Sequence, residues 1–401
     1  MRNNECKGIS LFYGYIILAY TIAEGLFGYG FTAFMYSKGL NLVQIGVLMG
    51  VTDLFTTIFD YPSGNLCDKY GRKKICGLGF VLYGFGFIIF GLSSTFLIFL
   101  FSGLIRAIGV ALISGAPATW YLAELEKRNA YDYKNKILPL LRGITLLVGS
   151  LSGIIAGKLS NINYSIPLYV GGVILIFSGI IINILYDDNK GNIQENNMFR
   201  VIINNTISFI KDPNMRLLSG FEMTRSIMFT IFIVAWQVYA ITQIGLKMEH
   251  LGYIYSFILV LMSITSFASR FLQKKMQGVK VTEIGVLFSI IGISIFLINK
   301  TVIIFLIGLI LFEIGTGLLN ASYYTWVYDF MPSNTRSSYA SALSSIQSFI
   351  GFILSICIGN FLEFVGYQWG WIVAIFFQAI ALIFLIKIRG RNALINEKQL
   401  L

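Results

Sequence analysis

The segment Gly64-Asn-Leu-Cys-Asp68-Lys-Tyr-Gly71-Arg72-Lys73-Lys74 lies at the junction of two long apolar stretches, residues 42–66 and 75–93. Each stretch is close in length to a spanning helix, which needs about 20 apolar residues to cross a bilayer. A short basic segment between two such stretches is typical of a loop that joins neighbouring spans on one side of a membrane. The pattern predicts a helical membrane protein.

The rest of the chain repeats this pattern, and twelve stretches qualify as spanning helices. They cover residues 11–36, 42–66, 75–93, 96–122, 137–160, 166–186, 217–241, 251–271, 284–297, 302–328, 341–364 and 371–386. The ninth is the shortest and could be extended by residues 279–283 or by Ile298. The apolar runs are continuous, whereas barrel strands alternate over about 10 residues, so we expect an all-α membrane fold.

Composition supports the same class. Of the 401 residues, 56% are hydrophobic and only 12% are charged, and the mean hydropathy is +0.75. A soluble domain carries about a quarter charged residues, so a soluble enzyme, a disordered chain and a coiled coil are excluded. Four Cys and one His provide neither a disulfide framework nor a zinc motif. No Walker A sequence occurs, so we expect no cofactor and no ATP hydrolysis.

The net charge of +11 is explained by the distribution of Lys and Arg. With twelve spans and both termini inside, 24 of the 30 basic residues fall on one side, 4 on the other, and Arg106 and Arg225 within spans. The positive-inside rule therefore predicts cytoplasmic termini in a multi-pass protein of the cell membrane. Nucleic acid is not needed as a partner to explain the charge.

The two halves resemble one another at an offset of about 206 residues. Residues 41–46 parallel residues 247–252, and residues 114–120 parallel residues 320–326. We expect two pseudo-symmetric six-helix bundles, residues 1–187 and 213–401. The hydrophilic stretch between them, residues 188–212, is predicted to be a cytoplasmic linker.

The basic segment quoted above resembles the G-x-L-x-D-x-x-G-R-K/R-x motif of the major facilitator superfamily. Matching residues are Gly64, Leu66, Asp68, Gly71, Arg72 and Lys73. The resemblance implies a secondary transporter in which Gly64, Asp68, Gly71, Arg72 and Lys73 form a cytoplasmic gate or latch. Glycine at position 64 would let two helices approach closely. The alternative is that these charges only set the topology.

Two further segments resemble the drug and metabolite proton-antiporter, or efflux, group of that superfamily. Leu104-Ile-Arg106-Ala-Ile-Gly109 is similar to an intramembrane Arg motif, and the fifth span contains Gly143, Gly149, Gly153 and Gly157. The usual Arg-to-Gly spacing is one residue longer, and the Gly-Pro step of the antiporter motif is absent. Small residues spaced four apart are explained equally well by plain helix packing.

Charged residues within the spans are candidates for proton coupling, because a charge at mid-bilayer costs at least about 2.5 kcal/mol. The candidates are Glu24, Asp53, Arg106 and Glu313. Glu24 could instead form a static bridge with Arg106. Glu222 and Arg225 are three residues apart on one helix, so we expect them to pair.

Aromatic and amide side chains within the spans are candidates for a substrate cavity. They are Trp120, Trp236, Gln237, Asn320, Tyr323 and Tyr324. Aromatic rings with a polar atom can bind apolar solutes and also orient them. The alternative for the aromatics is an interfacial belt.

The leading hypothesis is a monomeric transporter that alternates access and exports a small lipophilic drug or metabolite in exchange for protons. Its expected partners are that solute, protons and the lipid bilayer. The alternative is a proton-coupled nutrient importer. A remote alternative is an intramembrane hydrolase, but the only His is His250 and no His-Glu-x-x-His motif occurs, so we do not expect an enzyme.

Overall fold

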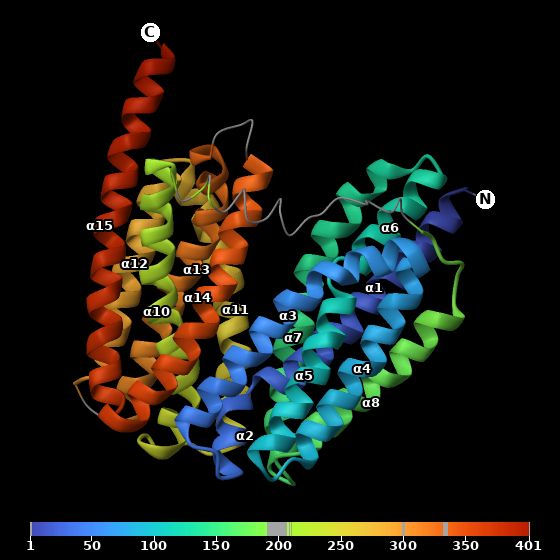
Figure 1. The fold of residues 1–401 in the computed structure, drawn as a ribbon, viewed down its shortest axis with the longest axis horizontal. Helices are drawn as coiled ribbons and strands as arrows, with labels where there is room; N and C mark the ends of the chain where they lie inside the picture. The colour runs from blue at the N-terminus through green and yellow to red at the C-terminus, as the bar shows by residue number, and fades with distance from the viewer. Residues whose placement is uncertain are drawn as a thin grey trace. The chain divides into compact units, whose positions relative to one another are not determined.

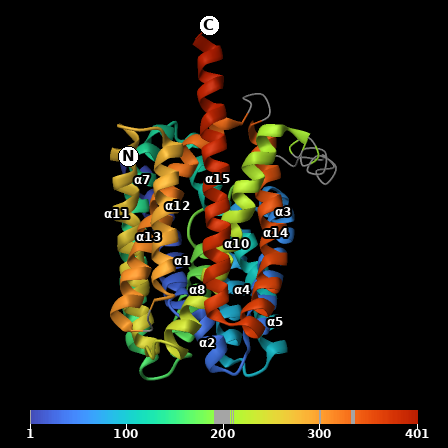
Figure 2. The same cartoon turned by 90° about the vertical axis from the view of Figure 1, so that its left-hand side faces the viewer.

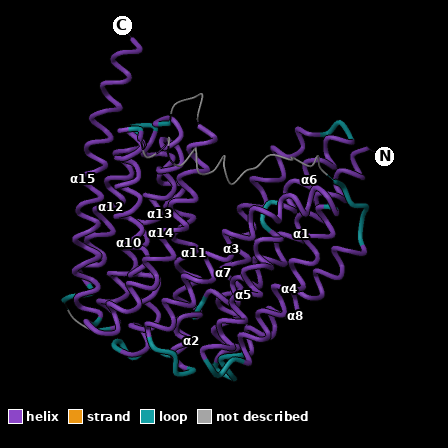
Figure 3. Tube along the Cα trace, viewed as in Figure 1, coloured by secondary structure: helices purple, strands orange, loops and turns teal. Residues whose placement is uncertain are grey.

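The structure is a computed structural model that describes residues 2–190, 207, 209, 211–298, 301–331 and 336–400. Every regular element in these ranges is a helix, which confirms the predicted all-α class (Figure 3). Most of the predicted linker, residues 188–212, lies outside the described residues.

Within the described residues, twelve helical spans are long and apolar enough to cross a membrane, as the sequence predicts. The helices are α1 (Arg2–Gly28), α2 (Phe31–Ser37), α3 (Leu42–Tyr70), α4 (Arg72–Leu92), α5 (Phe96–Ile113), α6 (Ala116–Lys127), η1 (Tyr131–Tyr133), α7 (Lys134–Ser160), α8 (Ile166–Ile184), α10 (Pro213–Thr242), α11 (Met248–Gln273), α12 (Gly278–Ile295), α13 (Val302–Phe330), α14 (Arg336–Val365) and α15 (Tyr367–Leu400). The ninth span is α12, so residues 279–283 extend it and Ile298 does not.

The predicted fourth span is interrupted between α5 and α6. Gly115 has a φ of +71°, a left-handed conformation that glycine adopts without steric cost. Pro117 stands in the first turn of α6, where its missing amide hydrogen breaks no helical bond. The two short helices therefore meet at a sequence-encoded turn.

Contacts between residues divide the chain into two compact units (Figure 1). Unit 1 comprises Met1–Glu195 and Lys247–Leu259, and unit 2 comprises Asn196–Leu246 and Val260–Leu401. Helix α11 therefore begins in unit 1 and continues in unit 2. The half-repeat of the sequence gives no indication of this division.

Glycines bring α4 and α5 close together in unit 1. A Cβ added at Gly79 would lie 2.9 Å from the Gly109 carbonyl oxygen, and one at Gly86 would lie 2.3 Å from Arg106 Cγ. The Ser102 hydroxyl donates to the Gly86 carbonyl oxygen at 2.9 Å. Small residues are the usual means by which membrane helices approach this closely.

The same contacts recur in unit 2 between α12 and α13, shifted by about 206 residues. A Cβ at Gly285 would lie 2.6 Å from the Gly315 carbonyl oxygen, and one at Gly292 would lie 2.6 Å from the Gly308 carbonyl oxygen. Helices α12 and α10 also pack on α15, which continues past the other helices of unit 2 (Figure 2). The helix pairs α4/α5 and α12/α13 are thus equivalent packing units of the two halves.

The glycine ladder of the fifth span packs against the start of α11 within unit 1. A Cβ at Gly153 would lie 2.5 Å from Ser256 Oγ, and one at Gly157 would lie 3.2 Å from the Gly252 Cα. The Ser256 hydroxyl donates to the Ser150 carbonyl oxygen at 2.5 Å, and the Ser150 hydroxyl donates to the Ser256 carbonyl oxygen at 3.1 Å. This spacing therefore serves helix packing.

Candidate functional site

The charged centre of unit 1 is built on Glu24 of α1. Its carboxylate accepts a short hydrogen bond from the Tyr83 hydroxyl on α4. Tyr83 is only 2% exposed, and its ring lies 4.8 Å from the Phe87 ring and 5.9 Å from the Tyr20 ring. An unpaired carboxylate in an apolar span would cost several kcal/mol, so the neutral Tyr83 donor stabilises the half-buried acid.

Arg106 of α5 lies beside this acid on a bed of aromatic rings. Its guanidinium carbon is 3.8 Å from the centre of the Phe27 ring and 5.4 Å from the centres of the Phe87 and Phe90 rings. Such cation–π contacts stabilise a desolvated cation by about 2 kcal/mol. The absence of a side chain at Gly86 leaves room for Arg106 against α4.

Within the described residues, Arg106 forms no ion pair with Glu24, and its buried Nε has no hydrogen-bond partner. The expected static Glu24–Arg106 bridge is therefore not formed in this structure. The positive charge of Arg106 still acts through space on Glu24 and on Asp53. Unit 1 thus contains an acid and a cation that are close but not bonded to each other.

Asp53 of α3 differs from Glu24 in its surroundings. Its side chain is exposed, and among the described residues no hydrogen bond or ion pair joins its carboxylate to Glu24 or to Arg106. The structure places it in the same unit and within the electrostatic reach of Arg106. Its part in proton coupling stays a prediction.

Unit 2 contains a second charged cluster, and here the charges are bonded directly. Arg225 and Glu222 of α10 form an ion pair at 2.7 Å, which confirms the predicted pair. Arg225 also donates to Asn320 Oδ1 of α13 at 3.2 Å, and Gln347 Nε2 of α14 donates to Glu222 Oε2 at 2.6 Å. The Gln347 contact was not foreseen, because nothing in its local sequence distinguishes it from other polar residues of α14.

Glu313 of α13 is 7% exposed and accepts a hydrogen bond from Thr316 Oγ1 at 3.2 Å, one turn along the same helix. Trp236 and Gln237 of α10 are also buried, and the Trp236 ring stacks 5.9 Å from the Phe232 ring. These residues therefore lie in the interior of unit 2.

A small cavity of about 170 Å³ opens beside the unit 2 cluster. Its lining includes Tyr323, Tyr324 and Gln347. The guanidinium of Arg225 lies 5.5 Å from the centre of the Tyr323 ring, and Tyr324 is 63% exposed. Three of the predicted cavity residues, Asn320, Tyr323 and Tyr324, thus gather around one charged cluster.

Trp120 of α6 lies elsewhere, in a packed cluster of unit 1. Its ring is 5.2 Å from the Phe12 ring and 1% exposed, and its Nε1 donates to the Asp187 carbonyl oxygen at 3.2 Å. The adjoining Asn189 donates to Glu124 at 3.0 Å. Trp120 therefore holds the segment after α8 in place and does not line the cavity beside the unit 2 cluster.

The predicted latch residues lie at the end of unit 1 that carries residues 69–74 and 127–136, here called the basic end. Asp68 and Arg72 form an ion pair at 3.2 Å, and Arg72 donates to the Thr119 carbonyl oxygen at 3.2 Å. Gly71 has a φ of +116°, and a Cβ there would collide with Asp188. Gly64 departs from its prediction: among the described residues, a Cβ there would meet no atom within 4 Å, so no close helix contact is formed at this position.

Asp188 and Lys73 tie α4 and α8 together at the basic end. Asp188 accepts hydrogen bonds from the backbone amides of Lys73 at 2.8 Å and Lys74 at 3.0 Å. The Lys73 ammonium donates to the carbonyl oxygens of Asn183, Leu185 and Tyr186 at the end of α8. An anion at a helix N-terminus and a cation at a helix C-terminus both complement the helix dipole. Asp188 was missed because its partner lies 115 residues away.

The fold and these buried charges define a class: a multi-pass helical membrane protein made of two related helical units. The family model of the Major Facilitator Superfamily matches residues 14–355. The chain therefore belongs to that superfamily of transporters, and it is not an enzyme.

Individual relatives share only low sequence identity with this chain. The uncharacterized MFS-type transporter YxaM of Bacillus subtilis is 26% identical over 257 residues, which are 62% of this chain and 62% of that protein. Multidrug resistance protein 2 of Bacillus subtilis is 24% identical over 189 residues, 44% of this chain and 43% of that protein. The chain thus spans less than two thirds of either relative. The crystal structure of the nucleoside transporter NupG is similar in fold, with a TM-score of 0.80 at 13% identity, covering 95% of this chain and 98% of that one.

Proposed function

We propose that this secondary transporter works by alternating access and couples proton entry to the export of a small lipophilic drug or metabolite. The observation that carries the proposal is the Glu24–Tyr83 hydrogen bond beside an Arg106 that forms no ion pair with any described residue. Glu24 can take up a proton without breaking a salt bridge, because its bonded partner is a neutral hydroxyl. A coupling acid needs this property, since it must change charge in every cycle.

The charge balance of the centre supports the same role. With Glu24 ionised, the positive charge of Arg106 compensates it through space, and with Glu24 protonated, the aromatic faces of Phe27, Phe87 and Phe90 still hold Arg106. Both protonation states are therefore accommodated in one packing arrangement. Asp53 and Glu313 are the further candidates for proton transfer.

For the solute, we propose binding next to the cluster of unit 2. Tyr323 and Tyr324 offer aromatic faces, while Gln347 and Asn320 offer hydrogen bonds. Such a surface suits an apolar molecule with a few polar groups. The partial similarity to Multidrug resistance protein 2 favours export over import.

The orientation follows from charge. We propose that the basic end of unit 1, with Asp68 and Arg72, faces the cytoplasm, as the positive-inside rule predicts. Gly71, Arg72, Lys73 and Asp68 would then act at the cytoplasmic gate, where movement of α4 against its neighbours changes access.

The proposal is tested with the full-length protein in liposomes that contain a pH dye. A proton gradient is imposed, and lipophilic cations, neutral antibiotics, sugars and amino acids are added in turn. We expect a lipophilic solute to trigger proton movement in the opposite direction, and Glu24→Gln to abolish it. Glu126→Gln, which removes an exposed acid of α6, is the matched control and should transport normally. Movement of solute and protons in the same direction would make the protein an importer, and a full response in Glu24→Gln would refute the coupling role.

A further inference from the structure

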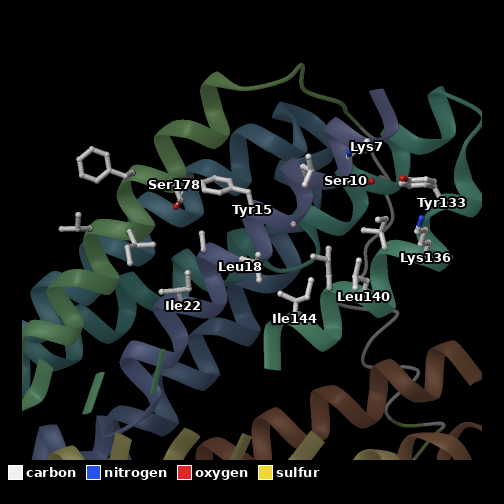
Figure 4. Close-up of a pocket in the computed structure, with 18 residues that line it drawn as sticks. Lys7, Ser10, Tyr15, Leu18, Ile22, Tyr133, Lys136, Leu140, Ile144 and Ser178 are labelled. Atoms are coloured by element: carbon white, nitrogen blue, oxygen red, sulfur yellow. Dashed lines mark hydrogen bonds between the residues drawn. The ribbon is translucent and has the colours of Figure 1, made fainter. Parts of the chain in front are cut away.

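An open groove runs along the outside of unit 1 between α7 and α8. Both helices pack on α1 but barely touch each other, so one face of α1 is left uncovered between them. The resulting cavity has a volume of about 900 Å³ and is lined by α1, α7, α8 and η1 (Figure 4). None of its lining residues belongs to the charged centre around Glu24.

The two ends of the groove differ in chemistry. Lys7, Ser10, Tyr133 and Lys136 gather at the basic end, whereas Ile22 lies at the far end (Figure 4). Both lysines are exposed, and none of the described lining residues is acidic. Among the described lining residues, the basic end therefore presents two positive charges and no negative charge to whatever occupies the groove.

Away from the lysines the groove is apolar. The hydroxyls of Tyr15 and Ser178, which lie within it, are hydrogen-bonded to each other at 3.0 Å. Their mutual bond leaves little for a polar solute to recognise. Leu140 and Phe177 on the two rims are 54% and 62% exposed, which is tolerable only where their neighbours are hydrocarbon.

The length of the groove matches one leaflet of a bilayer. Lys7 and Ile22 are 15 residues apart on α1, so the helix rise of about 1.5 Å per residue separates them by about 22 Å. Half of a hydrocarbon core is about 15 Å, and one headgroup layer adds roughly 5–7 Å. A phospholipid with its acyl chains at Ile22 would thus have its phosphate at Lys7.

We propose that this groove binds one anionic phospholipid of the adjoining leaflet, with the phosphate at Lys7 and Lys136 and an acyl chain along α1. Basic pockets between membrane helices are suited to acidic headgroups, and each lysine strengthens the attraction by roughly fivefold. The two lysines together should favour an anionic lipid over a zwitterionic one by about 30-fold.

Native mass spectrometry of the delipidated full-length protein tests this. The probes are phosphatidylglycerol, phosphatidylcholine with the same chains, and glycerol phosphate as a headgroup without chains. We expect one tightly held phosphatidylglycerol, and the Lys7→Ala/Lys136→Ala variant should lose its preference over phosphatidylcholine. The matched control is Lys38→Ala/Lys158→Ala, which removes the same charge from two exposed lysines outside the groove and should keep the preference.

Two further variants separate the parts of the proposal. Val173→Trp fills the apolar part of the groove at a position that is already 44% exposed, and it should weaken phosphatidylglycerol binding with both lysines present. Lys7→Arg/Lys136→Arg should retain the preference, which guards against a folding defect in the alanine variant. Equal losses in both alanine pairs, unchanged binding in Val173→Trp, or competition by glycerol phosphate would each overturn the proposal.

Discussion

Equivalent packing positions in the two units are occupied by residues of different chemistry. In unit 1 the Arg106 guanidinium lies 3.8 Å from the centre of the Phe27 ring. At the equivalent place in unit 2, about 206 residues later, the Phe312 ring lies 3.9 Å from the Phe232 ring. The Gly79–Gly109 contact of unit 1 recurs in unit 2 as the Gly285–Gly315 contact. A duplicated scaffold has thus kept its backbone packing while one copy contains a cation and the other an aromatic ring.

The acids of the two units differ in a related way. Glu24 in unit 1 is held by a neutral tyrosine, whereas Glu222 in unit 2 is held by Arg225 at 2.7 Å and by Gln347 at 2.6 Å. Protonation of Glu222 would leave Arg225 without its counter-charge, whereas protonation of Glu24 would break no ion pair. The difference supports a role for Glu24 in unit 1 as the group that changes charge, and for Glu222 and Arg225 in unit 2 as a fixed ion pair.

Removing the arginines gives the largest expected effect. Arg225→Met leaves Glu222 buried without its counter-charge, and breaking a buried pair in this way costs about 3–5 kcal/mol. Arg106→Met removes cation–π contacts and a charge that acts on Glu24 only through space, so we expect a smaller loss of about 1–2 kcal/mol. The measurement is thermal unfolding of the purified protein in detergent. The double variant Glu222→Gln/Arg225→Met should recover most of the stability, and equal losses for the two single variants would contradict the comparison.

Removing the tyrosine hydroxyl tests the neutral partner of Glu24. A hydrogen bond to a charged acceptor contributes about 1.5–3 kcal/mol, so Tyr83→Phe should reduce proton-coupled transport by roughly 10- to 100-fold. Tyr239→Phe is the control in unit 2, because the Tyr239 hydroxyl donates only a long bond of 3.4 Å to the Phe296 carbonyl oxygen. Initial rates of dye-reported proton movement in liposomes measure both variants. Equal rates in Tyr83→Phe and the unmodified protein would remove Tyr83 from the mechanism.

Adding a methyl group at equivalent glycines tests the shared packing. In Gly292→Ala the new Cβ would lie 2.4 Å from the Phe312 backbone nitrogen and 2.6 Å from the Gly308 carbonyl oxygen, and neither backbone atom can rotate away. In Gly86→Ala the closest atom is a side-chain carbon of Arg106, which can move. We expect a loss of about 1–3 kcal/mol for Gly292→Ala and a smaller loss for Gly86→Ala. A larger loss of thermal stability in Gly86→Ala would show that Arg106 is held more rigidly than its contacts indicate.

The sequence predicts the parts of this comparison that depend on local pattern. Apolar length gave the twelve spans, and the three-residue spacing on one helix face gave the Glu222–Arg225 pair. The offset of about 206 residues between the halves also relates the glycine contacts between α4 and α5 to those between α12 and α13.

The remaining contacts depend on which faces of distant helices meet. Tyr83 is 59 residues from Glu24, and Gln347 is 125 residues from Glu222. Spans that are apolar on nearly all sides carry little information about their rotation, because lipid and protein neighbours favour the same residues. Hydrophobic periodicity therefore cannot select these partners. Asp188 was missed because its partner Lys73 lies 115 residues away in the sequence.

The smallest effect is expected at two positions related by the offset of 206 residues, Cys67 at the basic end of unit 1 and Gln273 of α11 in unit 2. Cys67 is 5% exposed, and burial, together with the nearby Asp68 charge, raises the pKa of its thiol to about 11. Gln273 is half-buried and is bonded to Thr325 at 2.6 Å and Ser269 at 2.9 Å. Reactivity towards a maleimide should therefore differ between thiols at the two positions.

The comparison uses Cys67 alone, with the other three cysteines replaced by Ser, and Gln273→Cys with all four replaced. Since the thiolate is the reactive form and a raised pKa favours the neutral thiol, labelling of Cys67 should be slow at pH 7 and should rise about tenfold per pH unit up to about pH 11. The thiol at position 273 should react faster than Cys67 at pH 7, and its labelling rate should reach a plateau at a lower pH than that of Cys67. Asp68→Asn removes a carboxylate that raises the Cys67 pKa, so it should speed labelling severalfold at pH 8. Fast labelling of Cys67 at pH 7 in the protein that retains Asp68 would mean that the basic end of unit 1 opens readily. The Asp68–Arg72 ion pair would then not restrain α3 and α4.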